Sequence, residues 1–226
     1  QLESAQRLAG KWDIAREELE AFSLESRRRA RAATDSGYFE REIIPFDGLG
    51  FDETIRNTSM EAMAGLEPLA PGGTITAAVS SQTCDGSSAV LIVSEEALKR
   101  YNLTPRARIA HMSVRADDPI WMLTAPIPAT THALKKSGFS LDDIDLVEIN
   151  EAFASVPMAW LKEHDYAHEK TNVSGGAVAL GHPLGSTGTK LMTTLLHEME
   201  RRQVLYGLQT MCEGGGQANV TILERL

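Results

Sequence analysis

From about residue 88 to the end of the chain, short apolar runs alternate with segments rich in helix-forming residues. The apolar runs, each expected to form a strand, are residues 88–93, 108–114, 146–149, 205–211 and 218–223. The segments expected to form helices are residues 95–101, 127–136, 151–163 and 187–202. Because helices that alternate with strands pack on the faces of one sheet, this pattern predicts a layered α/β domain built on a central sheet.

The first part of the chain follows a different pattern. Residues 13–34 place apolar side chains among charges at helical spacing, and Gly37 follows as a stop signal, so we expect an amphipathic surface helix. Residues 42–71 offer short strand pieces, glycine-containing turns, and at most a short helix over residues 61–66. This stretch is typical of an elaborated lobe rather than of a sheet core.

Charge and composition exclude several classes of protein. The chain has 22 Lys and Arg against 31 Asp and Glu, a net charge of −9, which argues against a nucleic-acid binder. It shows no secretory leader pattern and no uncharged apolar run of the roughly 18 residues that a membrane span requires, so we expect a cytoplasmic protein. Two cysteines, Cys84 and Cys212, cannot build a disulfide framework or a four-cysteine zinc site, and we expect no metal.

Three segments rich in glycine and polar residues lie at the ends of predicted elements: residues 150–154 (NEAFA), 175–185 (GGAVALGHPLG) and 212–216 (CEGGG). Asn150 ends a strand where open α/β sheets bind ligands, although a helix N-cap would also explain it. His182 lies in a stiff turn and can act as a base, unless the turn instead cradles a phosphate or the histidine is a bystander. Cys212 precedes three glycines that admit a substrate, or it is an inert buried thiol. Together, in this order, the three segments are hard to explain by packing.

These segments resemble the C-terminal signature blocks of the thiolases, acyl-CoA acyltransferases that interconvert a 3-oxoacyl-CoA plus CoA with acetyl-CoA and a shortened acyl-CoA. The resemblance extends over the whole chain, through SRRRARAA, DETIR, TITAAVSSQTCDGSSAV, APIPATTHALKKSG and the final TILERL. Ketosynthases share the fold but place two histidines in their sites and lack the CEGGG ending. The resemblance therefore implies a thiolase of fatty-acid or steroid side-chain β-oxidation.

A thiolase-like chain is expected to have a layered α-β-α-β-α fold, with a mixed sheet and helices on both faces. The resemblance assigns residues 1–80 to the later part of the loop domain, 81–104 to the last strand and helix of the N-terminal domain, and 105–226 to the complete C-terminal domain. The first half is then incomplete, and the family's acylated cysteine lies in the absent part, since Cys84 is interpreted as structural. A longer or cleaved parent chain is favoured over a separate chain for that half, because residues 88–93 alone would leave strand edges exposed.

The resemblance assigns catalytic roles to four residues. It implies that His182 activates the nucleophilic cysteine and donates to the thioester oxygen, and that Asn150 holds a water that supplies the second donor. Cys212 would exchange a proton with the acetyl carbon or with incoming CoA, and Gly214 would offer its backbone N–H to the oxyanion. Each preplaced donor is worth about 3 to 4 kcal/mol in comparable sites. A thiolate beside an imidazolium predicts a lowered pKa for Cys212.

For the CoA tail, the resemblance implies that Ser81 and Phe153 contact the pantetheine and that Arg56 lies near the nucleotide. The family often reads AGNASG where residues 77–82 read AAVSSQ, a variant similar to thiolases that act on bulky, including steroid-derived, substrates. CoA is expected as a substrate with 3-oxoacyl-CoA, with no permanent cofactor, and the family implies a homodimer or tetramer. The alternative is a non-catalytic acyl-CoA-binding subunit or scaffold that lacks the nucleophile.

Overall fold

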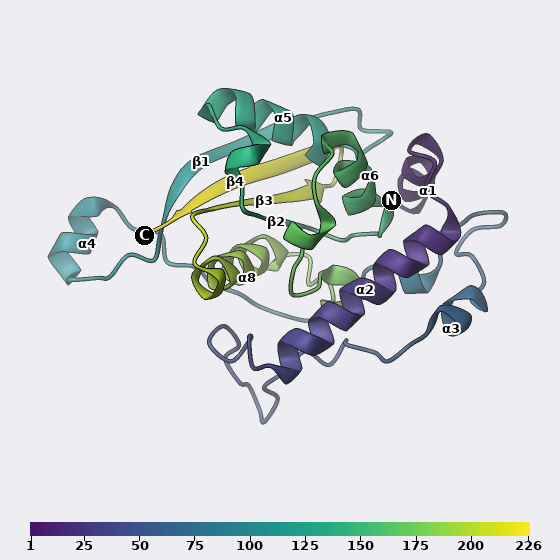
Figure 1. Cartoon of the computed structure of the whole chain (residues 1–226), viewed down its shortest axis with the longest axis horizontal. Helices are drawn as coiled ribbons and strands as arrows, with labels where there is room; N and C mark the ends of the chain where they lie inside the picture. Colours follow the sequence, from purple (N-terminus) through teal and green to yellow (C-terminus); the bar gives the residue numbers. More distant parts are fainter.

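One mixed sheet of four strands organises the chain (Figure 1). The structure, a computed structural model, describes residues 1–226. The strands are β1 (Ala107–Ala116), β2 (Leu146–Ile149), β3 (Tyr206–Glu213) and β4 (Gln217–Arg225). They lie in the order β1-β4-β3-β2, where β4 is antiparallel to both of its neighbours and β2 is parallel to β3. The predicted α/β class with a mixed sheet is confirmed.

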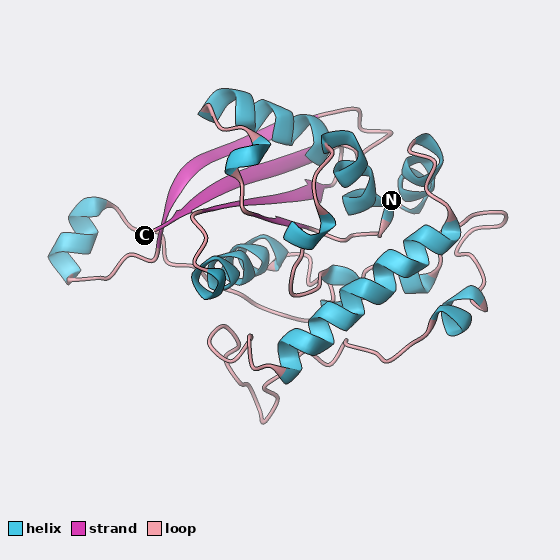
Figure 2. Cartoon of the chain, viewed as in Figure 1, coloured by secondary structure: helices cyan, strands magenta, loops and turns pink.

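Helices cover both faces of this sheet (Figures 1 and 2). One face carries α5 (Pro126–Ser137) and α6 (Ser155–His164), and the other carries α8 (Thr187–Arg202). The α5 side buries a cluster that includes Ala129, Ala133, Val147, Trp160, Leu208 and Ile222. The α8 side buries Leu146, Leu195, Met199 and Leu223. Gly207 on β3 lets α8 approach closely, because a Cβ there would run into Leu195 and Met199.

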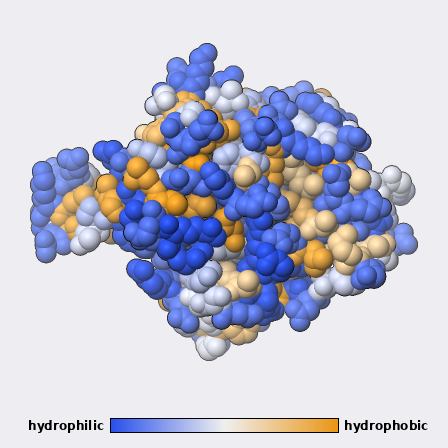
Figure 3. Space-filling view, in the orientation of Figure 1, coloured by the Kyte–Doolittle hydropathy of each residue, from blue (hydrophilic) through white to orange (hydrophobic).

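The remaining helices are α1 (Leu2–Lys11), α2 (Arg16–Asp35), α3 (Met60–Ala64), α4 (Glu95–Tyr101) and α7 (Ala177–Leu180). Three short 3₁₀ turns cover Ala77–Val79, Leu141–Asp143 and His168–Lys170. The long helix α2 runs past α7, and α1 packs against α6 (Figure 1). By contrast, α4 stands off the body, as Figure 3 also shows, and none of its residues is buried. No helix is both long and apolar enough to cross a membrane.

Most predicted elements are found within a few residues of their expected bounds. Strand 146–149 and helix 187–202 agree with β2 and α8 residue for residue. The α5 helix ends at Gly138, whose φ of +81° is the left-handed conformation that favours glycine. At the start of α4, the Ser94 side chain accepts a hydrogen bond from the Ala97 N–H, as its predicted N-cap role requires.

Three predictions about secondary structure are wrong. Residues 88–93 form no strand, so the segment 81–104 holds only a helix. No neighbouring strand is available to pair with this run, and Leu91 and Ile92 are 80% and 64% exposed. The strand pieces expected in residues 42–71 reduce to an isolated bridge between Phe46 and Leu49. The helix expected from residue 151 begins at Ser155, and α1 was not predicted from the sequence.

Candidate active site

The parallel pairing of β2 and β3 brings two of the three glycine-rich and polar segments together. Ile149, the last residue of β2, pairs with Thr210 of β3, and the Asn150 N–H donates to the Thr210 carbonyl at 3.2 Å. Because parallel strands end at the same edge of a sheet, Asn150 and Cys212 lie at the same edge. This is the place where the topology itself favours a ligand site.

Residues 79–82 pack against the segment 150–154 at this edge and connect the third segment, residues 175–185, to it. The Ser81 N–H donates to the Ala152 carbonyl at 3.0 Å, and the Ala154 N–H donates to the Val79 carbonyl at 2.8 Å. Further along the same stretch, the His182 N–H donates to the Gln82 carbonyl at 2.9 Å. These backbone bonds explain why α6 starts late: the backbone of residues 152–154 pairs with residues 79–81 instead of turning into the helix.

A cavity of about 510 Å³ opens where these segments meet. Its lining includes His182, Cys212, Gly214, Ser81 and Phe153, so the structure brings five of the seven predicted site residues around one space. Met122, Leu123, Ala152, Leu184 and Met211 make part of this wall apolar. Asn150 is fully buried behind the wall, next to His182. Arg56 is exposed and does not line this cavity.

His182 and Asn150 form one polar pair. The Nδ2 atom of Asn150 lies 3.4 Å from Nε2 of His182, and Oδ1 of Asn150 is buried without a hydrogen-bond partner. On the other side of the ring, Nδ1 of His182 lies 2.7 Å from Oγ1 of Thr187, the first residue of α8. Burial lowers the pKa of His182 below its ordinary value of 6.5, so the ring is neutral at pH 7. Thr187 was not identified from the sequence, where it reads as an ordinary residue of a helix start.

Cys212 lies near the end of β3, and only 9% of it is exposed. Burial raises the pKa of its thiol to about 12, so the expectation of a lowered pKa is wrong for this structure. The physical reason is that a buried thiolate is stabilised only by a nearby positive charge. Because burial favours the neutral form of His182, its ring does not supply that charge. The resting pair is therefore a thiol and a neutral imidazole.

The turn between β3 and β4 consists of the three glycines 214–216. Gly215 and Gly216 have φ values of +78° and +80°. A Cβ on Gly216 would meet the backbone of Asp118 and Pro119, and the Asp117 N–H donates to the Gly216 carbonyl at 2.7 Å. A Cβ on Gly214 would meet nothing within 4 Å. Gly216 thus anchors the turn, and Gly214 is left open beside Cys212 at the cavity.

Family models match nearly all of the chain. The thiolase C-terminal domain matches residues 103–225, and the thiolase N-terminal domain matches residues 3–96. The chain belongs to the thiolase family. This thiolase chain is 58% identical over 230 residues to the steroid 3-ketoacyl-CoA thiolase FadA6 of Mycobacterium tuberculosis, which covers 100% of the chain and 56% of the relative. It is 44% identical to a 3-ketoacyl-CoA thiolase of Serratia proteamaculans, over 99% of the chain and 62% of the relative.

Solved thiolases have the same fold as this chain. The human mitochondrial 3-ketoacyl-CoA thiolase in complex with CoA superposes with a TM-score of 0.96 at 43% identity, covering 99% of this chain and 58% of that one. The Bacillus anthracis acetyl-CoA acetyltransferase superposes with a TM-score of 0.94 at 39% identity, covering all of this chain and 60% of that one. The present thiolase chain therefore spans between 56% and 62% of the length of these relatives.

Proposed function

We propose that this chain is the part of a thiolase that carries the acid/base machinery, in an enzyme that interconverts a 3-oxoacyl-CoA plus CoA with acetyl-CoA and a shortened acyl-CoA. The nucleophilic cysteine comes from outside these 226 residues, because no residue here matches its family block. The observation that carries the proposal is the convergence of His182, Cys212 and Gly214 on one cavity. The names of the relatives, which include 3-ketoacyl-CoA and steroid 3-ketoacyl-CoA thiolases, support it.

In this proposal, the direction of the Cys212 pKa fits an acid rather than a resting base. The cysteine from outside the chain loses its proton to Nε2 of His182 and attacks the 3-oxo carbon. The bond between C2 and C3 then breaks, and the electron pair goes to C2 of the departing acetyl-CoA. A thiol whose pKa is about 12 is protonated at neutral pH, and Cys212 gives its proton to that carbon.

The second half of the cycle returns the protons. The CoA thiol gives its proton to the Cys212 thiolate, and the CoA sulfur attacks the acyl-cysteine. The released cysteine regains its proton from His182, so both groups end as they began. The unpartnered Oδ1 of Asn150 is a ready acceptor for a water beside the thioester oxygen, and the Gly214 N–H serves the oxyanion of the tetrahedral intermediate.

The same proposal covers how CoA is bound, which substrate is used, where the protein is located and how it assembles. Ser81 and Phe153 line the cavity, which supports their role at the pantetheine, whereas Arg56 lies outside the lining and is assigned to the nucleotide end only by its motif. CoA is a substrate, and no permanent cofactor is invoked. The proposal also includes a fatty-acyl or steroid-derived substrate, a cytoplasmic location and assembly as a homodimer or tetramer.

The test uses the full-length protein, including the cysteine-bearing half, with a 3-oxoacyl-CoA and CoA. We expect acetyl-CoA as a product and an acyl adduct on a cysteine outside residues 1–226, both identified by mass spectrometry. His182→Ala and Cys212→Ala should abolish turnover, whereas His132→Ala on α5, outside the cavity lining, should not. CoA binding by calorimetry without any acyl transfer by the wild type would favour the non-catalytic subunit instead.

A further inference from the structure

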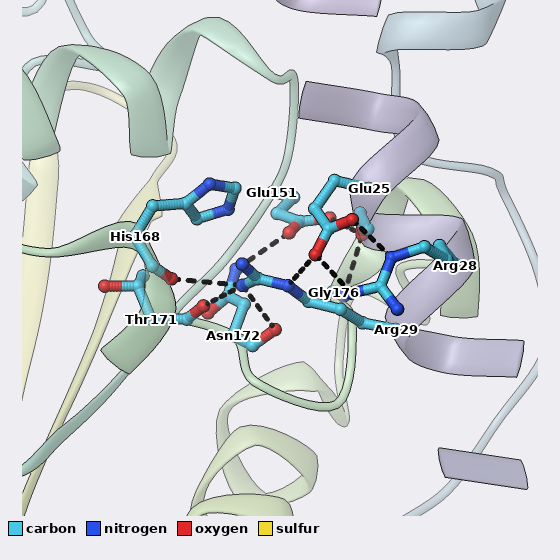
Figure 4. Close-up of polar contacts among 9 residues, drawn as sticks. Glu25, Arg28, Arg29, Glu151, His168, Thr171, Asn172 and Gly176 are labelled. Carbon is cyan, nitrogen blue, oxygen red and sulfur yellow. Dashed lines mark hydrogen bonds and ion pairs between the residues drawn. The ribbon is translucent and has the colours of Figure 1, made fainter. Parts of the chain in front are cut away.

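Next to Asn150 lies a buried carboxylate to which the proposed mechanism gives no role. Glu151 is 1% exposed, follows the end of β2 by two residues, and has hydrogen-bond partners in α2 and α7 (Figure 4 shows its surroundings). Its Oε1 accepts a hydrogen bond from Nδ2 of Asn172 at 2.9 Å. Its Oε2 accepts from Oγ of Ser26 at 2.8 Å and from the backbone N–H of Val178 at 3.1 Å. One side chain therefore links three separate segments of the chain.

Every partner of this carboxylate is fixed as a donor. The Gly176 N–H donates to Oγ of Ser26 at 3.0 Å, so the serine proton points to Glu151. Oδ1 of Asn172 accepts from the Ile149 N–H at 2.9 Å, which turns the Nδ2 group of Asn172 toward Glu151. The surroundings of Glu151 thus supply only donors. They suit a group with two acceptor oxygens and offer no partner for a donor.

Burial raises the pKa of Glu151, whereas the hydrogen bonds from its three donors and, after them, the charge of Arg29 favour the ionised carboxylate. Arg29 of α2 lies close by and donates to the carbonyls of Thr171 and His168 at 2.7 and 3.1 Å (Figure 4). Glu25 holds the Arg29 side chain at 2.7 Å. The guanidinium thereby fixes the strand-like segment that carries Asn172 and also stabilises the negative charge of Glu151.

Two of the four catalytic candidates, Asn150 and His182, lie close in sequence to members of this network. Glu151 directly follows Asn150, and Nδ2 of Asn172 also donates to the Ile149 carbonyl at 2.9 Å, so the end of β2 is clamped just before Asn150. Val178 lies in α7, and His182 follows the end of that helix by two residues. Gly176, at the start of α7, makes room for the carboxylate, because a Cβ there would collide with it.

We propose that Glu151 is a positioning residue that holds Asn150 and His182 in register with each other. The inference rests on the proposed thiolase function, because the reaction is what depends on that register. The alternative is that Glu151 only stabilises the fold, as buried polar networks often do. Catalytic groups are sensitive to displacement, since an error of about 1 Å can cost on the order of 100-fold in rate.

The test compares two variants of the full-length protein. Glu151→Gln keeps the shape but places an amide donor among fixed donors. Tyr166→Phe is the control, since it removes a part-buried hydrogen bond elsewhere, from the Tyr166 hydroxyl to the Ile144 carbonyl at 2.7 Å. Neither Glu151 nor Tyr166 lines the cavity. We expect Glu151→Gln to lower kcat by about 100-fold, with KM for CoA within about twofold of the wild type. Tyr166→Phe should also lower the thermal stability but keep kcat.

A crystal structure of the Glu151→Gln protein gives a readout that does not need activity. The separation of Asn150 Nδ2 from His182 Nε2 should exceed its present 3.4 Å, with the rest of the fold unchanged. An inactive wild type would overturn the proposed function but leave this measurement valid. If the wild type is active, any of three results for Glu151→Gln would overturn the positioning role. The variant could keep kcat, lose activity only in step with unfolding, or keep the 3.4 Å separation.

Discussion

The Thr187 hydroxyl fixes which nitrogen of His182 carries the proton. Oγ1 of Thr187 lies 2.7 Å from Nδ1 of His182 and 3.0 Å from the Pro183 carbonyl. Since a carbonyl can only accept, the threonine proton goes to Pro183, and the hydroxyl oxygen accepts from the Nδ1–H group. Nε2 is then left with its lone pair on the side of Asn150, in the form that a base requires.

Thr187→Val should therefore impair catalysis without filling the cavity. Valine has nearly the same shape but cannot accept from Nδ1, so the tautomer is no longer fixed. Removing a group that orients a metal-bound histidine costs about 10- to 100-fold, and we expect a loss of that size in kcat here. Thr187→Ser, which keeps the hydroxyl, should restore most of it. Equal activity of the valine and serine variants in steady-state assays would contradict the assignment.

The pH profile should show an acid limb that lies lower than that of an ordinary histidine. Burial lowers the pKa of His182 from 6.5, so the ring stays neutral, and able to take a proton, below that pH. We expect the acid limb of kcat/KM of the full-length protein to have its midpoint below pH 6.5. A limb centred above 6.5 would mean that a nearby negative charge, rather than burial, dominates the site.

Thiol labelling should separate the two cysteines of the chain. The pKa of Cys212 is raised to about 12 and the residue is buried, whereas Cys84 is only partly buried. Because the thiolate is the reactive form, iodoacetamide at pH 7 should modify Cys84 before Cys212 in the absence of substrate. Peptide mapping by mass spectrometry measures both rates in one sample. Preferential labelling of Cys212 would instead support the thiolate expected from the sequence.

The sequence was most informative where local pattern and tertiary packing agree. The apolar run at 146–149 and the amphipathic helix at 187–202 need only their own periodicity and their end signals to be placed, and both are confirmed. The three glycine-rich and polar segments were recognisable because each follows a strand or precedes a helix. Two of them meet at one cavity because β2 pairs in parallel with β3, and the third is joined through the hydrogen bond from the His182 N–H to the Gln82 carbonyl. Fold class alone leaves both of these contacts open.

The predictions from the sequence are wrong or incomplete where the structure depends on contacts between residues that are distant along the chain. Residues 88–93 read as a strand, but a strand needs a partner, and none of the four strands pairs with this run. The thiol of Cys212 was expected to be acidic because of a neighbouring imidazole, yet burial dominates both groups. Glu151 reads as a helix residue in the NEAFA segment, and only the contacts with Ser26 and Asn172 show what it holds.

A second buried carboxylate predicts how stability depends on pH. Glu42 lies against α8, where its Oε2 accepts from Oγ1 of Thr194 at 3.1 Å, and Lys190 is near enough to favour its charge. Burial nevertheless outweighs both and raises the pKa of Glu42 to about 7. Its side chain is 7% exposed, so solvent screens the effect little.

Between pH 4.5, the ordinary pKa of this carboxyl, and pH 7, the folded protein binds more protons at Glu42 than the unfolded chain does. The contribution to stability is therefore full below pH 4.5 and is lost as the pH rises to about 7. Glu42→Gln should remove this dependence, so the full-length wild type should lose more stability than the variant between pH 5 and 7.5, by up to about 2 kcal/mol in urea unfolding. Glu40→Gln, at an exposed glutamate, is the control and should follow the wild type. Parallel pH dependence of wild type and Glu42→Gln would show that the carboxyl titrates normally.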